Sequence, residues 1–281
     1  MNLPIRSYLY VPGYDERRIG KAFASDADAV VLDLEDAVAP NRKDAARDTV
    51  VRVLESGPEK PVFVRVNAVG TELAAADIEA VIGRHLAGLR LPKIQWVESV
   101  MLVAETLDEL RSEAVIQCLI ESALGLERAF EIAISHERVA GISLGEADLA
   151  ADLGVSDEAG LLYARSRIVS AARAAGLPHP VQSVYTNVRD LEGLRRSTEE
   201  GRRLGFVGRS TIHPSQIPVV NEVFTPTEDE AAEAQALLDR LGGEAASGTG
   251  AFVLEDGRFV DRAVVESARL TLSLARREVM S

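Results

Sequence analysis

The chain has 281 residues, of which 47% are apolar, and carries a formal net charge of −13. This size and composition allow a substantial buried core, as one large α/β domain or a domain with an appendage, and a disordered chain is not expected. The acidity argues against a nucleic-acid-binding surface, because phosphate binding needs a basic patch. A lone cysteine, Cys118, excludes a disulfide or a thiolate metal site within one chain.

The amino-terminal segment MNLPIRSYLYVPG runs directly into a strand pattern, without a basic stretch followed by an apolar one. It is therefore not predicted to be a secretory signal. No apolar run approaches the roughly 18 residues needed to span a bilayer. We expect a cytoplasmic protein with neither a membrane segment nor a nucleic-acid partner.

Short β-branched runs alternate with helical, Ala- and Glu-rich segments. Eight such units over about 215 residues match a (β/α)8 TIM barrel, whose strands are buried on both faces. A doubly wound open sheet is the alternative, but VPGYDER has one glycine where a dinucleotide-binding turn needs several. The expected strands cover residues 5–11, 28–34, 61–66, 88–93, 115–120, 138–144, 180–184 and 205–212.

The pattern changes near Pro226. Residues 227–242 are expected to form a helix, GGEAASGTGA a linker, AFVLEDGRFVD a hairpin, and residues 262–278 a final helix. We therefore predict a barrel domain over 1–225 and a helix–hairpin–helix extension over 226–281.

Acids and bases follow several of the expected strands, at positions that share the mouth of a parallel barrel. Glu121 ends the fifth strand and Asp148 follows the sixth. Because adjacent strands lie about 4.8 Å apart, the two carboxylates can share one cation. With oxygen ligands and no Cys or His cluster, Mg²⁺ is the predicted metal. The alternative is that either acid only caps a helix, which applies more to Asp148.

Arg65 lies inside a strand that is otherwise apolar, so it must pair with an acid or an anionic ligand. We assign Glu35 to Arg65 and Asp36 to the water shell of the metal, since the two acids point to opposite sides of an extended strand. A purely structural ion pair between Arg65 and these acids is the alternative. Lys93 can bind a thioester or a phosphate, or it is a surface lysine.

Eight motifs resemble, in the same order, those of citrate lyase β-subunit-like proteins of the HpcH/HpaI aldolase superfamily. The resemblance covers nearly the whole chain. The motifs are RSYLYVPG, AVVLDLEDAV, FVRVNAVGTE, LPKIQ, LIESALGL, GEADLAADLG, GFVGRSTIHPSQI and GAFVLEDGRFVD.

The resemblance implies a Mg²⁺-dependent TIM-barrel lyase that splits a 3-hydroxyacyl-CoA thioester into an acyl-CoA and a 2-oxo acid. It implies that Arg65 binds the substrate and that Glu121 and Asp148 hold the metal. It also implies that Asp261 transfers the proton, acting on the barrel of a neighbouring subunit in a trimer or hexamer. Without the resemblance, Asp261 would be interpreted as a helix N-cap.

By the same analogy, the residues expected to bind the phosphates of coenzyme A at the barrel mouth are Arg6, Lys21, Lys93 and Arg209. The chain departs from the family pattern at four places. These departures leave substrate choice and coenzyme contacts open, but the two expected metal ligands, Glu121 and Asp148, are present. Where the family has E-D-L after the sixth strand, this chain reads Glu146-Ala147-Asp148-Leu149, so the middle acid has moved one place while Asp148 remains. The other departures are Gln95, where relatives often carry Glu, Gln182, where an aspartate is common, and Arg209, where lysine is common.

The leading hypothesis is a stand-alone lyase for malyl-CoA, methylmalyl-CoA or citramalyl-CoA. The alternatives are the β subunit of a citrate lyase complex acting on citryl groups carried by an acyl carrier protein, a malyl-CoA thioesterase, and a catalytically silent barrel with a binding or regulatory role. The sequence leaves the 2-oxo acid open, because glyoxylate and pyruvate differ by one methyl group.

Overall fold

A computed structural model describes residues 4–83, 85–244, 252–253, 259–260 and 262–275. Its described residues form two compact units, Ile5–Asn221 and a second unit that contains Pro4 and the described residues from Glu222 on. In the described part no helix is long and apolar enough to cross a membrane.

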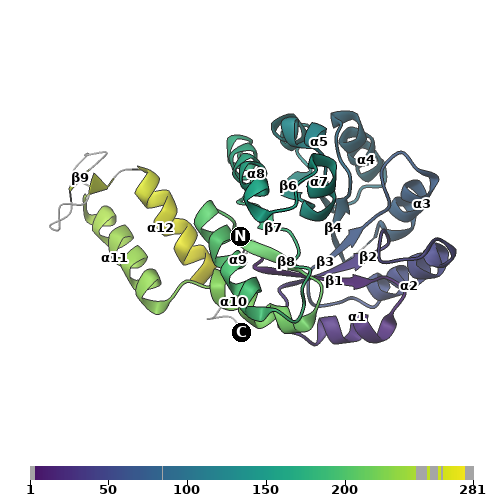
Figure 1. Ribbon diagram of the computed structural model, residues 1–281, viewed down its shortest axis with the longest axis horizontal. Coiled ribbons are helices and arrows are strands. Elements are labelled where there is room, and N and C mark those ends of the chain that lie inside the picture. The colour runs from purple at the N-terminus through teal and green to yellow at the C-terminus, as the bar shows by residue number, and fades with distance from the viewer. Residues whose placement is uncertain (1–3, 84, 245–251, 254–258, 261, 276–281) are drawn as a thin grey trace. The chain divides into compact units, whose positions relative to one another are not determined.

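The first unit is a parallel, nearly closed barrel with helices around it (Figure 1). The strand order is β6-β5-β4-β3-β2-β1-β8-β7, and β6 lies beside β7, where the backbone N–H of Glu146 donates to Ser183 Oγ at 3.2 Å. The strands are β1 Ser7–Pro12, β2 Ala29–Asp33, β3 Val62–Arg65, β4 Leu86–Leu91, β5 Val115–Ile120, β6 Val139–Leu144, β7 Val181–Gln182 and β8 Gly208–Thr211.

Helices connect consecutive strands, as a right-handed parallel barrel requires. The α-helices of this unit are α1 Glu16–Phe23, α2 Lys43–Glu55, α3 Glu72–Val81, α4 Val97–Glu109, α5 Ala123–Glu127, α6 Ala129–Ala133, α7 Glu146–Leu153, α8 Leu162–Ala174, α9 Leu191–Leu204 and α10 Ile217–Phe224, the last of which runs into the second unit. The short 3-10 helices are η1 Pro40–Arg42, η2 Glu158–Leu161 and η3 Pro214–Gln216.

The predicted TIM barrel is confirmed, and each predicted strand overlaps an observed one. The physical reason is clearest in β2, where four consecutive residues over 29–32 are completely buried because side chains face both the barrel interior and the helices.

An apolar layer fills the barrel interior toward the amino-terminal ends of the strands. Tyr8 and Phe63 pack edge to face with ring centroids 5.3 Å apart, and Ala29, Val31 and Val181 complete the cluster. Burial of such side chains contributes about 1.5–3 kcal/mol each. This layer closes the barrel at one end, so the open space lies at the carboxyl ends of the strands.

The second unit contains α11 Glu228–Glu244, the antiparallel pair β9 Phe252–Val253 and β10 Phe259–Val260, and α12 Arg262–Ala275. Thr227 caps α11: its Oγ1 accepts from the backbone N–H of Glu230 at 3.1 Å, and the Glu230 carboxylate accepts from the Thr227 N–H at 2.8 Å. The turn of the hairpin predicted over AFVLEDGRFVD lies outside the described residues.

Candidate active site

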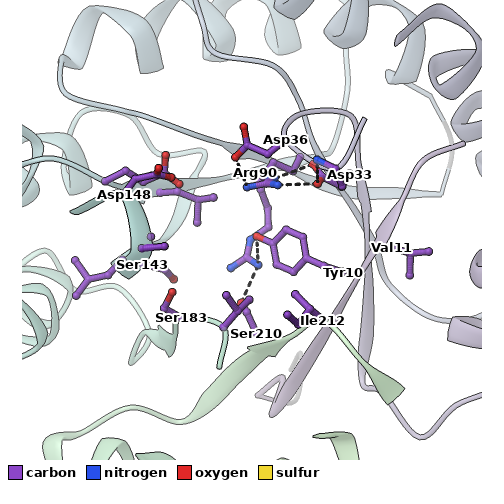
Figure 2. Close-up of a pocket in the computed structure, with 18 of the residues that line it drawn as sticks. Tyr10, Val11, Asp33, Asp36, Arg90, Ser143, Asp148, Ser183, Ser210 and Ile212 are labelled. Carbon is purple, nitrogen blue, oxygen red and sulfur yellow. Dashed lines mark hydrogen bonds and ion pairs between the residues drawn. The ribbon is translucent and has the colours of Figure 1, made fainter. Parts of the chain in front are cut away.

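A pocket of about 470 Å³ opens at the carboxyl ends of the barrel strands (Figure 2). This is the end at which TIM-barrel enzymes place their chemistry. Every strand contributes to the wall, or the residue directly after it does. The eight residues are Tyr10, Asp33, Arg65, Arg90, Leu119, Ser143, Ser183 and Ser210.

Glu121 and Asp148 both line this pocket, as predicted from the sequence. Glu121 directly follows β5, and Asp148 lies in the first turn of α7 after β6. The Glu121 side chain is buried, and its Oε2 accepts the backbone N–H of Lys93 at 3.0 Å. Gly145 provides the space: a Cβ there would lie 2.5 Å from both Cγ and Oε1 of Glu121.

The surroundings of Glu121 disfavour the charged form of its carboxyl group. Burial, followed by the negative charges of Glu35 and Asp148, raises its pKa to about 8, and Arg65 offsets this only in part. A divalent cation beside Glu121 and Asp148 would stabilise both carboxylates.

The donor set fits magnesium. Among the described residues no group of three or more His, Cys, Asp or Glu side chains is placed to hold a metal ion. Two carboxylates suit Mg²⁺, which keeps several water or substrate oxygens in its coordination shell. Glu121 and Asp148 are therefore the residues that can hold it.

Arg65 is held by acids from β2 and the loop after it. Its Nε and Nη2 bind Asp33 Oδ1 and Oδ2 at 2.8 and 2.6 Å, and its Nη1 lies 3.0 Å from Glu35 and 3.6 Å from Asp36. Burial opposes the charge, but the hydrogen bond and charge of Asp33, with Tyr10 and Glu35, raise the pKa of Arg65 above its usual value. The guanidinium is thus a fixed cation at the pocket wall.

The predicted contact between Arg65 and Glu35 is present, but the principal partner, Asp33, was not predicted. Asp33 pairs with Arg65 in the β2–β3 register and is 2% exposed. The signal that could have revealed it is an acid within the apolar run AVVLD, two residues after the inward-facing Val31.

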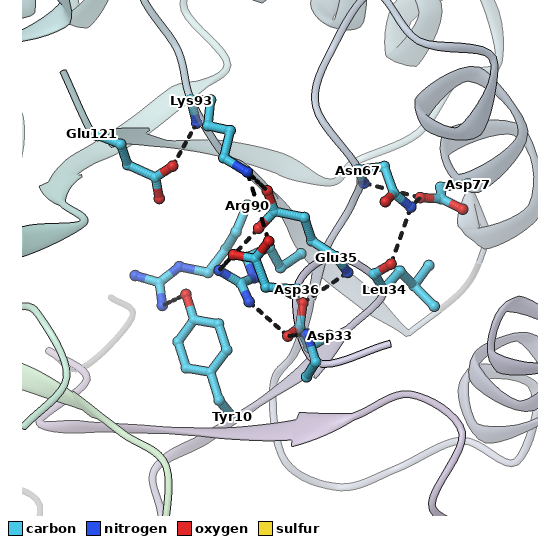
Figure 3. A network of polar contacts seen from close by, with 12 residues as sticks. Tyr10, Asp33, Leu34, Glu35, Asp36, Asn67, Asp77, Arg90, Lys93 and Glu121 are labelled. Carbon is cyan, nitrogen blue, oxygen red and sulfur yellow. Dashed lines mark hydrogen bonds and ion pairs between the residues drawn. The ribbon is translucent and has the colours of Figure 1, made fainter. Parts of the chain in front are cut away.

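Lys93 and Glu35 extend this network toward the mouth (Figure 3). Lys93 Nζ lies 2.7 Å from Glu35 and 3.6 Å from the half-exposed Asp36. Burial raises the pKa of Glu35, although Arg65 and Lys93 oppose the shift. Glu35 therefore links the two cations, and the role of Asp36 in a metal water shell stays a prediction.

Three other predicted residues lie in different places. Lys21 is exposed on α1 and lines a second pocket of about 510 Å³ with Arg17 and Arg18. Arg6 precedes β1, at the closed end of the barrel, and pairs with Asp28 at 3.1 Å. Arg209 is 2% exposed.

The prediction that Arg6 and Arg209 border the mouth is wrong. Arg209 is the second residue of β8 and the register partner of Ser7, and its guanidinium points toward α9, where it donates to Ser197 and Thr198. Both arginines lie within expected strands, and strand direction and side-chain alternation decide which end and which face of the barrel they occupy.

Glu146 belongs to the segment Glu146-Ala147-Asp148-Leu149, which departs from the family pattern, and it forms an ion pair with α8. Its carboxylate accepts from Nε and Nη2 of Arg165 at 3.0 and 2.7 Å, and Arg165 is 3% exposed. Glu146 thus fixes α7 against α8 and leaves Asp148 to face the pocket. Asp261, the predicted proton donor, lies outside the described residues.

The chain was compared with known families and proteins. The family model for HpcH/HpaI aldolase/citrate lyase matches residues 6–214. A (3S)-malyl-CoA thioesterase of Cereibacter sphaeroides is 36% identical over 97% of this chain and 95% of its own. The citrate lyase subunit beta of Leuconostoc mesenteroides is 34% identical over 96% and 93%.

Comparison with solved structures indicates the same family. Protein CitE of Mycobacterium tuberculosis, in complex with magnesium, acetoacetate and coenzyme A, matches with a TM-score of 0.76 and 34% identity over 96% of this chain and 97% of its own. A citrate lyase beta subunit from M. tuberculosis with oxaloacetate and magnesium gives 0.68 and 34% over 78% and 96%. The chain belongs to the HpcH/HpaI aldolase/citrate lyase family of magnesium-dependent enzymes.

Proposed function

We propose that this protein is a Mg²⁺-dependent carbon–carbon lyase that cleaves a 3-hydroxyacyl-CoA thioester into an acyl-CoA and a 2-oxo acid. Malyl-CoA, methylmalyl-CoA and citramalyl-CoA are the leading substrates. The observation that carries the proposal is that Glu121, Asp148 and the clamped Arg65 all line one pocket. One magnesium ion, held by Glu121 and Asp148, and the fixed Arg65 cation would then face the same bound anion.

The residues divide the reaction between them. Glu121 and Asp148 would hold Mg²⁺, which supplies a Lewis acid that lowers the pKa of the substrate hydroxyl. Arg65, fixed by Asp33 and Glu35, stabilises the negative charge that develops on oxygen as the carbon–carbon bond breaks. Asp261 delivers a proton to the carbon of the departing thioester enolate, or removes one in the condensing direction.

The second pocket supports a coenzyme A substrate. Arg17, Arg18 and Lys21 line it, and Tyr10 and Ile212 line both pockets. The two spaces therefore adjoin, and cations on α1 can bind phosphates while the thioester reaches the metal pair. In a chain with net charge −13, these cations form a local basic patch that can attract an anionic ligand.

We propose that the protein is a homo-oligomer, a trimer or hexamer, in which the C-terminal extension brings Asp261 to a neighbouring barrel. The family resemblance supports this arrangement. Asp261→Asn is expected to lose turnover while Mg²⁺ affinity is unchanged, and mixing it with Glu121→Ala subunits should restore part of the activity. If Asp261→Asn is fully active, the proton-donor assignment is wrong.

The proposal is tested by incubating the protein with Mg²⁺ and malyl-, methylmalyl-, citramalyl- and citryl-CoA while measuring 2-oxo acid and free thiol. We expect 2-oxo acid from at least one substrate and none after EDTA. Free thiol without 2-oxo acid would identify a thioesterase instead. No product from any thioester would favour the silent barrel, or a subunit that requires a carrier protein.

A further inference from the structure

Arg90 is a buried cation that the sequence analysis did not select. It lies in β4, is 1% exposed and lines the first pocket. Its Nη1 donates to Tyr10 Oη at 2.9 Å and to Ser210 Oγ at 3.2 Å (Figures 2 and 3). Both partners are neutral hydroxyl groups.

Arg90 differs in this respect from Arg65 and Arg165, which each bind a carboxylate through two nitrogens. Among the described residues no acid forms an ion pair with Arg90, and its Nε has no hydrogen-bond partner. The rings of Tyr8 and Tyr10, with centroids 4.8 and 5.3 Å from Cζ, are its other electrostatic contacts.

A buried guanidinium without a counter-ion is unfavourable, and aromatic faces and hydroxyls compensate only in part. Arg209 is also buried without an acid, but it points toward α9 and does not line the pocket. Arg90 therefore stands out as a cation that faces the substrate space with its charge uncompensated. An anionic group of the ligand is the missing partner.

The position of Arg90 indicates which group this is. Arg90 is the register partner of Arg65 on the neighbouring strand, but its guanidinium extends toward Tyr10 and Ser210, away from Glu35 and Asp36. In the proposed reaction, Arg65 and the magnesium ion held by Glu121 and Asp148 bind the carboxylate next to the oxo group. A substrate with a second carboxylate would present it to Arg90.

We infer that Arg90 is a specificity-determining residue that binds a second carboxylate, so that the 2-oxo acid half of the substrate is a dicarboxylate. The inference rests on the proposed function and, among its test substrates, favours citryl-CoA, which releases oxaloacetate, over malyl-, methylmalyl- and citramalyl-CoA, which release glyoxylate or pyruvate. The neutral hydroxyls of Ser143, Ser183 and Ser210 line the same pocket and can accept or donate around that carboxylate.

The test measures equilibrium binding to the Mg²⁺-loaded protein by calorimetry, with two ligands that differ in one group. Oxaloacetate carries a distal carboxylate where 2-oxobutyrate has a methyl group. We expect the wild-type protein to bind oxaloacetate at least roughly 10-fold more tightly. Arg90→Met should bring the two dissociation constants within about 3-fold by weakening oxaloacetate alone.

Arg173→Met is the matched control, because it makes the same substitution at an exposed arginine of α8 that does not line the pocket; it should retain the preference. Equal binding of both ligands by the wild-type protein overturns the inference even if Arg90→Met does not fold. Equal weakening of both ligands in Arg90→Met also overturns it. If neither ligand binds, the inference is also overturned. The proposed function is decided separately by the thioester assay, in which release of a 2-oxo acid without a dicarboxylate preference leaves that function standing.

Discussion

The barrel interior contains two layers that are only two residues apart along the same strands. The layer at the closed end is apolar, with Phe63 against Tyr8, whereas the layer at the mouth holds Arg65 and Asp33. In β3, Phe63 and Arg65 face the same interior. The comparison shows that one strand supplies stability at one end and chemistry at the other.

The largest expected effect on the mouth layer comes from Glu121→Ala. Removing one of two candidate metal ligands should lower turnover by roughly 10³-fold or more. The free energy of unfolding of the metal-free protein should not fall, since the buried carboxyl group has an unfavourably raised pKa. Steady-state kinetics and urea unfolding check both, with the exposed Asp44→Ala as the control. Unchanged activity would contradict the metal assignment.

A pair of substitutions in β3 separates the two layers. Phe63→Ala should lower the free energy of unfolding by about 3–5 kcal/mol because it leaves a cavity beside Tyr8. Arg65→Lys keeps the charge but loses the two-nitrogen contact with Asp33, so turnover should fall roughly 10²-fold. Denaturant unfolding and kinetics of both variants provide the test. Equal losses of stability would show that the layers do not divide these roles.

Two glycines at β6 test how closely the mouth is packed. Gly145→Ala would place a Cβ 2.5 Å from Glu121, so Mg²⁺ affinity should fall about 10- to 100-fold. Gly141→Ala is the matched control, because its nearest neighbour is Gln117 Cγ at 3.9 Å. Calorimetric Mg²⁺ titration of both variants measures the difference. Similar affinities would mean that the Glu121 side chain moves without cost.

The smallest expected effect is on pH dependence. In the metal-free protein the pKa of Glu121 is raised from 4.5 to about 8, so the folded state holds this proton more tightly than the unfolded chain. The stability contribution of Glu121 is therefore full at low pH and lost as pH rises from 4.5 to about 8.

Magnesium binding needs the carboxylate, so affinity should rise by at most about tenfold per pH unit up to the pKa of Glu121. Calorimetry at pH 7 in two buffers of different ionisation enthalpy should detect proton release. The same experiment on Glu121→Gln should show none. Proton release that persists in this variant would assign it to another group.

Sequence reasoning found the residues whose type is unusual at the end of an apolar run. Glu121, Asp148 and Arg65 were predicted and line one pocket. Asp33 and Arg90 also interrupt apolar runs but were missed, because the face of the strand that each side chain occupies is set by the tertiary structure.

The prediction for Arg6 and Arg209 failed for a related reason. Arg6 precedes β1 at the closed end of the barrel. Arg209 lies in β8 but faces α9, whereas the next residue, Ser210, lines the pocket. Gly145 gives no local signal either, since its importance comes from the Glu121 side chain on the adjacent strand.

The sequence alone determined the alternation of strands and helices, the family motifs and the acids suited to magnesium, because hydrophobic periodicity and residue chemistry are local properties. Only the tertiary structure decided that Asp33 holds Arg65, that Arg90 is buried beside neutral hydroxyls, and that Arg209 faces a helix. Those facts depend on register and strand direction, which bring together residues that are far apart in the chain.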